Sequence, residues 1–248
     1  MKLALGLMFT NEIGFLKLHL PIYKNSFDGI VALTDPRTTD GSTEFLWNEM
    51  GAAVMEKEWS YDWGDFATTL CRFAEEKGYD AIMRMDPDEC LMPQAGSAIK
   101  LMLERTAALL CFPRHEFFGD RTRARADLYP DYQARAWHLN RGIRVQGKRH
   151  EGVGFAEHGL SEHTTEPKNR VYRLKDPYLH IFHYGWIGRE GIYRNQVKYQ
   201  SHAQVEAGGP PEVNFGEDFQ LVDLPTIPFT EPQPIDPEAC GIYAPFKE

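Results

Sequence analysis

Ala81-Ile82-Met83-Arg84-Met85-Asp86-Pro87-Asp88-Glu89-Cys90 is the stretch that decides the fold. Its first residues are mostly large and apolar, which predicts a buried strand, and Pro87 ends that strand because it has no N–H for the ladder. Asp86 and Asp88 therefore lie at the strand's carboxyl end. Two carboxylates this close repel each other unless a cation lies between them, and their oxygens suit Mg²⁺ or Mn²⁺. A lone Asp-x-Asp is a weak pattern, however, and a solvated acidic turn is the alternative.

The first 90 residues alternate between patterns typical of buried strands and of amphipathic helices. This β-α-β-α-β-α-β order with short connections predicts an α/β fold, a mostly parallel sheet with helices on both faces. Ligands of such sheets bind beyond the carboxyl ends of the strands, where Thr10, Asp35 and Asp86 would lie. The predicted strands are residues 2–9, 28–34, 52–56 and 81–86; the predicted helices begin at residue 10, with Pro21 as a kink or an end, and cover 45–50 and 66–78.

The pattern changes in the second half of the chain. A helix is predicted from Pro93 to about Arg105, and then a strand over 108–113 that ends at Arg114-His115-Glu116. Alternation over 132–138, a turn at 140–142 and a return strand over 143–145 predict an antiparallel hairpin. The predictions after it are an aromatic strand over 178–184 that carries His180 and His183, a helix over 189–206 and a Pro-rich extension over 208–248.

The composition is that of a soluble globular protein. A chain of 248 residues is long enough for one sizeable α/β domain. No stretch approaches the roughly 20 apolar residues of a membrane helix, and no small-residue cleavage site follows the apolar N-terminus, so we expect a cytoplasmic location. The four cysteines form no C-x-x-C pair, which argues against a zinc knuckle or a disulfide framework.

Charge is distributed unevenly along the chain. The net charge of −9 argues against a general affinity for nucleic acid, yet residues 105–175 hold 14 Lys and Arg against 8 Asp and Glu. Aromatic residues are interleaved with this basic stretch. A non-catalytic function therefore stays open, the binding of a polyanion such as nucleic acid. A merely solvated basic face is the other interpretation.

Three motifs follow the predicted strands in order. Asn11-Glu12 follows the first, Asp35-x-x-Thr38-x-Asp40-Gly41-Ser42 the second, and Asp86-x-Asp88-Glu89 the fourth. Together they resemble the family 2 glycosyltransferases of the GT-A, Rossmann-like fold. Tyr129-Pro130-Asp131-x-Gln133-x-Arg135 and the later His150-Glu151 resemble the branch that includes lipopolysaccharide-core glucosyltransferases and related bacterial and phage enzymes. The resemblance implies a transferase domain over 1–207, with a nucleotide-sugar-binding half (1–105) and an acceptor-side half (106–207), before the extension 208–248.

The resemblance also implies an activity, the metal-dependent, inverting transfer of a sugar from a nucleotide-diphosphate donor such as a UDP-sugar. The acceptor would be a glycan, a lipopolysaccharide-like molecule or a DNA base. Mn²⁺ or Mg²⁺ would stabilise the departing diphosphate. By the same resemblance Asp88 would bind the cation and Asp86 the cation or the ribose, and His183 would be a third ligand, although a hydrogen-bonded core histidine is the alternative. The implied donor-binding residues are Thr10, Asn11, Glu12, Asp35, which would accept a base N–H, Asp40, Asp86 and Arg135.

An inverting transfer needs a base to take the acceptor's proton. The predicted base is Glu151, because it stands where the family branch carries its His-Glu pair; a surface glutamate paired with Arg149 is the alternative. Glu217-Asp218 is the rival acidic pair. A second His-Glu dipeptide, His115-Glu116, is interpreted as chance, with a place in the acceptor site as the other possibility.

Overall fold

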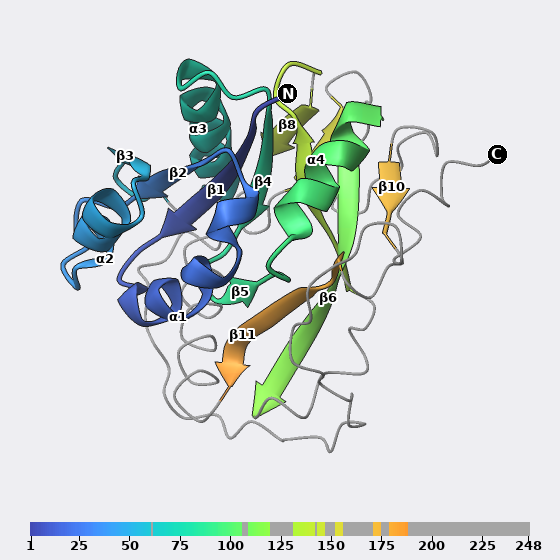
Figure 1. The fold of residues 1–248 in the computed structure, drawn as a ribbon. Helices are drawn as coiled ribbons and strands as arrows, with labels where there is room; N and C mark the ends of the chain where they lie inside the picture. The colour runs from blue at the N-terminus through green and yellow to red at the C-terminus, as the bar shows by residue number, and fades with distance from the viewer. Residues whose placement is uncertain are drawn as a thin grey trace, which may run out of the picture.

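The computed structural model describes residues 1–60, 62–105, 109–119, 131–141, 143–146, 152–155, 171–174 and 179–187. Within these residues the fold is the predicted α/β fold, with a mostly parallel sheet (Figure 1). The described strands are β1 (Leu3–Phe9), β2 (Gly29–Thr34), β3 (Ala53–Glu56), β4 (Ala81–Met85), β5 (Glu89–Cys90), β6 (Leu109–Gly119), β7 (Asp131–His138), β8 (Ile143–Gln146), β9 (Gly152–Phe155), β10 (Val171–Arg173) and β11 (Ile181–Ile187). The described helices are α1 (Ile13–Tyr23), the 3₁₀ turn η1 (Lys24–Ser26), α2 (Ser42–Glu44), the π-helical turn η2 (Phe45–Glu49), α3 (Trp63–Glu76) and α4 (Ala95–Arg105).

Parallel pairing sets the edge of the sheet at which the predicted site residues lie. The main sheet has the order β3-β2-β1-β4-β7-β6-β11-β5, with β10 beside β6, and β3, β2, β1 and β4 are mutually parallel. The register places Phe9 beside Thr34 and Leu7 beside Met85. The residues that follow these three strands therefore leave the sheet at the same edge, which is the edge where ligands of such sheets bind.

Helices cover both faces of this sheet, which confirms the prediction. Leu3, Leu5 and Leu7 lie in the core cluster that holds the apolar residues of α1 and α4. Ala4 and Met8, which alternate with them along β1, lie in the cluster that holds those of α3. Because β1 is buried on both faces, all seven of its residues are apolar or glycine.

The predicted end of the strand near Pro113 was wrong. β6 runs from Leu109 through Pro113 to Gly119, so that His115 and Glu116 belong to the strand. The reason lies in its neighbours: β10 pairs with residues 109–111 of β6, whereas β11 pairs with residues 114–119. Pro113 lies between these two pairings on one side of β6 and opposite Tyr132 of β7 on the other side.

The predicted hairpin also has a different partner. β7 pairs with β4 and β6, both antiparallel, and not with β8. β8 instead pairs with β9 in a separate two-stranded ribbon. The alternation that suggested a hairpin is satisfied in β7 by β6, the strand that precedes it, and by β4, which is remote in sequence; local pattern does not reveal this choice.

α4 begins at Ala95, after a turn that contains Pro93, and not at Pro93 as predicted. Pro21 lies inside α1, which continues to Tyr23, so Pro21 does not end the helix. No helix among the described residues is long and apolar enough to cross a membrane. The predicted helix over 189–206 and the extension 208–248 lie outside the described residues.

Candidate active site

The Asp86–Glu89 turn is held from several sides. Glu89 N–H donates to the carbonyl of Asp86, and the Glu89 carboxylate accepts the Asp86 N–H in return, both over 3.0 Å. The Pro87 carbonyl lies 3.1 Å from Nδ1 of the buried His19, from α1. Because backbone and side chains fix this turn, the carboxylates of Asp86 and Asp88 leave it in set directions.

Both carboxylate oxygens of Asp86 face guanidinium groups. Arg84 Nη1 lies 2.7 Å from Oδ1, and Arg135 Nη2 lies 3.1 Å from Oδ2. Arg135 is 1% exposed, and its Nη2 also lies 2.6 Å from Oε1 of Glu89, which is fully buried. Two of the predicted donor-binding residues, Asp86 and Arg135, are thus in contact.

Asp88 faces His183, which belongs to β11, the last described strand. β11 pairs antiparallel with β5, with His183 opposite Glu89, and Tyr184 N–H donates to the Asp88 carbonyl over 2.8 Å. This pairing brings His183 Nε2 to 3.3 Å from Asp88 Oδ2. The other ring nitrogen, Nδ1, lies 2.7 Å from Oε2 of the buried Glu116.

The electrostatic environment of His183 is dominated by these two acids. Burial lowers the pKa of His183, but Glu116 and Asp88 raise it more, so that it lies well above its ordinary value. Burial likewise raises the pKa of Glu116, whereas His183 and Arg114 lower it to a net value below the ordinary one. The two carboxylates therefore favour the protonated form of His183 as long as no cation is bound.

Alternating charges connect Asp86 with Asp88. Arg114 forms ion pairs with Glu116, Glu89 and Asp131. The path from Asp86 runs through Arg135, Glu89, Arg114, Glu116 and His183 to Asp88, and we call it the ionic ring. Burial and Asp86 raise the pKa of Glu89 to about 7, against the lowering effect of Arg114.

The loop after β2 folds against the start of α1. Asp40 accepts N–H groups from Ile13 and Ser42, over 2.9 and 3.0 Å, and the Ser42 hydroxyl accepts the N–H of Glu12. These bonds satisfy free donors of the first turn of α1. Asn11 has a φ of 51° and accepts the Thr39 N–H. Three of the predicted donor-binding residues, Asn11, Glu12 and Asp40, are therefore brought together, next to Thr10.

The Asp35 carboxylate is hydrogen-bonded by residues of the segment that follows it. Its carboxylate accepts from the side chain and the N–H of Arg37 and from the Trp59 N–H, over distances of 2.6 to 2.8 Å. The Arg37 guanidinium holds the pKa of Asp35 well below its usual range. Asp35 is 1% exposed, whereas the Arg37 side chain is 63% exposed, so Arg37 closes this carboxylate off from the solvent.

No protein-family model and no curated protein matches the chain. Solved structures with a similar course of the chain include S. aureus TarS, with a TM-score of 0.48 and 12% identity over 81% of this chain. Others are the glucosyl-3-phosphoglycerate synthase of Mycobacterium tuberculosis, with a TM-score of 0.40 and 14% identity over 59% of this chain, and 4-diphosphocytidyl-2C-methyl-D-erythritol synthase, with 0.38 and 14% over 57%. This chain spans 39%, 61% and 77% of their respective lengths. Likeness at these identities concerns fold alone.

Sequence reasoning missed the place of Glu116. The His115-Glu116 dipeptide was interpreted as chance, yet Glu116 lies against His183 because β6 and β11 pair in parallel with these two residues in register. His115 points elsewhere, to His180. Only the distant strand pairing distinguishes the two residues. The predicted base Glu151, its neighbour His150 and the rival pair Glu217-Asp218 lie outside the described residues.

Two further observations bear on ligands. Among the described residues no group of three or more His, Cys, Asp or Glu side chains is arranged to hold a metal ion. Arg114 and Arg135, from the basic stretch 105–175, lie in ion pairs of the ionic ring rather than on an open basic face.

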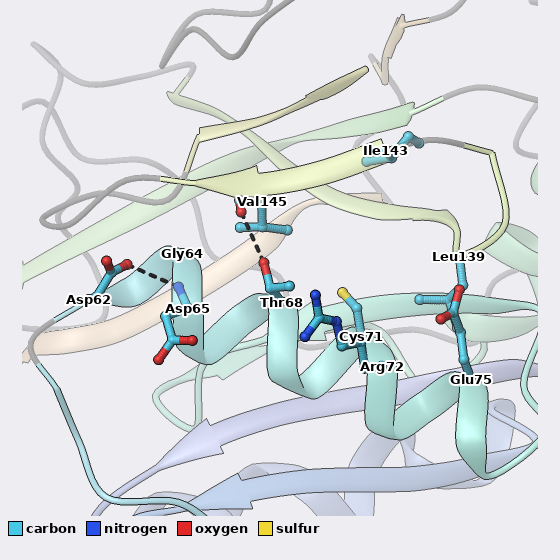
Figure 2. Close-up of a pocket in the computed structure, with 10 residues that line it drawn as sticks. All are labelled: Asp62, Gly64, Asp65, Thr68, Cys71, Arg72, Glu75, Leu139, Ile143 and Val145. Atoms are coloured by element: carbon cyan, nitrogen blue, oxygen red, sulfur yellow. Dashed lines mark hydrogen bonds between the residues drawn. The ribbon is translucent and has the colours of Figure 1, made fainter. Parts of the chain in front are cut away.

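A pocket of about 550 Å³ lies between α3 and β8 (Figure 2). The Thr68 hydroxyl donates to the Val145 carbonyl across it, and the Asp62 side chain accepts the Asp65 N–H at the start of α3. Its described lining contains none of the predicted site residues; it consists of Asp62, Gly64, Asp65, Thr68, Cys71, Arg72, Glu75, Leu139, Ile143 and Val145. The pocket is thus separate from the ionic ring.

Proposed function

We propose that the chain transfers a sugar from a nucleotide-diphosphate donor, a UDP-sugar, to an acceptor with inversion at the sugar carbon, in a reaction that depends on Mn²⁺ or Mg²⁺. The observation that carries this proposal is the approach of His183 to Asp88 at the carboxyl edge of the parallel strands. A lone acidic turn has no need of such a partner. A carboxylate and an imidazole that meet at a ligand-binding edge are side chains of the kinds that bind transition metals.

The distance between the two side chains is suitable for one shared cation. Neighbouring ligands of a six-coordinate cation with bonds of about 2.1 Å lie about 3 Å apart, and Asp88 Oδ2 and His183 Nε2 are separated by 3.3 Å. Such cations usually have one or two protein ligands, and phosphate oxygens complete the coordination. The carboxylate suits both Mg²⁺ and Mn²⁺. When bound, the cation would stabilise the charge that develops on the leaving diphosphate.

Asp86 would act beside this pair. Its two oxygens are oriented by Arg84 and Arg135. We assign it the ribose of the donor, or the far side of the cation, because its carboxylate leaves the same turn as that of Asp88. The guanidinium groups also limit the repulsion between the two carboxylates.

The nucleotide would bind where Thr10, Asn11, Glu12 and Asp40 meet. Asp35 would accept an N–H of the base, which requires Arg37 to move away. The exposed Arg37 guanidinium would move into water, while the base N–H and the Trp59 N–H would supply donors to the buried Asp35 carboxylate.

The acceptor's proton would go to Glu151 as the base, with Glu217 or Asp218 as the rivals. Gly152, the next residue after Glu151, pairs with Gln146 at the end of the β8–β9 ribbon.

A panel of UDP-, GDP- and CMP-sugars tests this function. The protein is incubated with each donor and Mn²⁺, and binding and slow donor hydrolysis are measured. We expect one donor class to bind and to be hydrolysed only when Mn²⁺ is present. If no donor binds and none is hydrolysed, the proposal is wrong.

A further inference from the structure

We propose that Glu116 is a positioning residue that orients the His183 imidazole, so that Nε2 is directed to the cation shared with Asp88. The inference rests on the proposed function, since it concerns the same cation. Glu116 itself would not touch the cation or the donor. It would act through His183 alone.

The strand register places Glu116 and His183 together. β6 and β11 pair in parallel with Glu116 directly beside His183, and the two residues are 2% and 8% exposed. Oε2 of Glu116 lies 2.7 Å from Nδ1 of His183. A short contact between a carboxylate and an imidazole in such a buried place is a charge-assisted hydrogen bond.

This contact decides which ring nitrogen can bind a metal. A neutral imidazole carries one N–H and one lone pair, and a metal takes the lone pair. A cation that binds His183 takes the place of the proton at Nε2, while the hydrogen at Nδ1 stays with its acceptor Glu116; the lone pair is then at Nε2, the atom that lies 3.3 Å from Asp88. Carboxylate partners of metal-binding histidines fix the ring in this way, and their loss typically weakens metal binding about 10–100-fold.

Glu116 is held in turn by the ionic ring. Its Oε1 forms an ion pair with Arg114, whereas its Oε2 contacts His183. A purely structural role, as a counter-ion for buried Arg114, is the competing explanation. Arg114 keeps Glu89 and Asp131 when Glu116 is neutralised. A counter-ion role therefore predicts a change in stability with no change in cation affinity.

The experiment measures Mn²⁺ affinity by electron paramagnetic resonance, on the full chain, with Mn²⁺ alone and with Mn²⁺ plus UDP. The variants are Glu116→Ala, Glu116→Gln, His183→Ala and the double variant E116A/H183A. Glu104→Gln is the matched control, because Glu104 is 42% exposed and lies on α4. Thermal unfolding of every variant shows whether it is folded, and Glu116→Gln, which keeps the shape of the side chain, replaces Glu116→Ala if the latter does not fold.

We expect Glu116→Ala to weaken Mn²⁺ binding about 10–100-fold and Glu116→Gln, which retains an acceptor oxygen, to weaken it less. In the His183→Ala background, removing Glu116 should add no further loss, because the residue acts through His183. Unchanged Mn²⁺ affinity in both Glu116 variants, or an equal loss with and without His183, overturns the inference while the proposed function stands. If the native protein binds no Mn²⁺ with or without UDP, the proposed function fails and the inference fails with it.

Discussion

The imidazole of His183 lies 3.3 Å from the carboxylate of Asp88, although the two residues are far apart in sequence. The contact depends on the antiparallel pairing of β11 with the short strand β5, directly after the acidic turn. The candidate active site is therefore assembled only when the last described strand joins the sheet.

The buried ion pair of Arg135 and Glu89 predicts that removing Arg135 alone costs more stability than removing both charges. Arg135→Met leaves the buried Glu89 with Arg114 as its remaining ion-pair partner, and we expect a loss of about 3–5 kcal/mol in the free energy of unfolding. The double variant R135M/E89Q removes the uncompensated charge and should lose less than Arg135→Met alone. Urea unfolding of the two variants decides this. A double variant that is less stable than the single one would contradict the buried-pair account.

The contact between His115 and His180 predicts a loss of stability in acid. Burial lowers the pKa of each to about 4, from an unfolded value of 6.5. Between these two pKa values the unfolded chain binds protons that the folded chain does not bind. The free energy of unfolding therefore decreases as the pH falls from 6.5 to 4. Each proton that only the unfolded chain binds changes the free energy of unfolding by about 1.4 kcal/mol per pH unit.

Urea unfolding at several pH values in this window checks the prediction. The matched comparison is the double variant H115F/H180F, which removes both titrating groups. We expect a shallower pH dependence for this variant than for the native chain. Identical slopes would show that these histidines do not differ between the folded and unfolded states.

Two glycines predict opposite outcomes of the same substitution. A Cβ on Gly96 would lie 2.5 Å from the backbone oxygen of Ser26, and a backbone atom cannot easily move away. Gly96→Ala should therefore cost about 1–3 kcal/mol in the free energy of unfolding. A Cβ on Gly14, in α1, would meet no atom within 4 Å, and Gly14→Ala should stabilise the helix by about 0.5–1 kcal/mol. Chemical denaturation of both variants tests the packing of η1 against α4.

Sequence pattern was sufficient where structure is local. The apolar run before Asp86 and the helical spacing of its neighbours predicted the parallel half of the sheet, because each strand there is followed by a short connection and a helix. The prediction failed at Pro113 and at the hairpin over 132–145. There the outcome depends on which of several strands supplies the partner, and the local pattern does not distinguish them.

The same difference separates the site residues. Asp86 and Asp88 were recognisable from the sequence, because a strand that ends in acids is a local feature. Glu116 was not, because its contact with His183 follows from the register of β6 and β11. The family resemblance implied a role for His183 but did not identify Glu116 as its partner. That contact follows from the pairing of β6 with β11.

The most direct measurement of the central claim is the binding of UDP by calorimetry, with and without Mn²⁺, to the native chain, Asp88→Ala, His183→Ala and the surface control Glu76→Gln. Asp88 and His183 would both bind the cation that holds the diphosphate. We predict that Mn²⁺ strengthens UDP binding to the native chain and the control at least tenfold, and that either site variant loses this gain while it keeps its fold. Equal UDP affinity with and without Mn²⁺ in the native chain, or an unchanged gain in Asp88→Ala, would contradict the account.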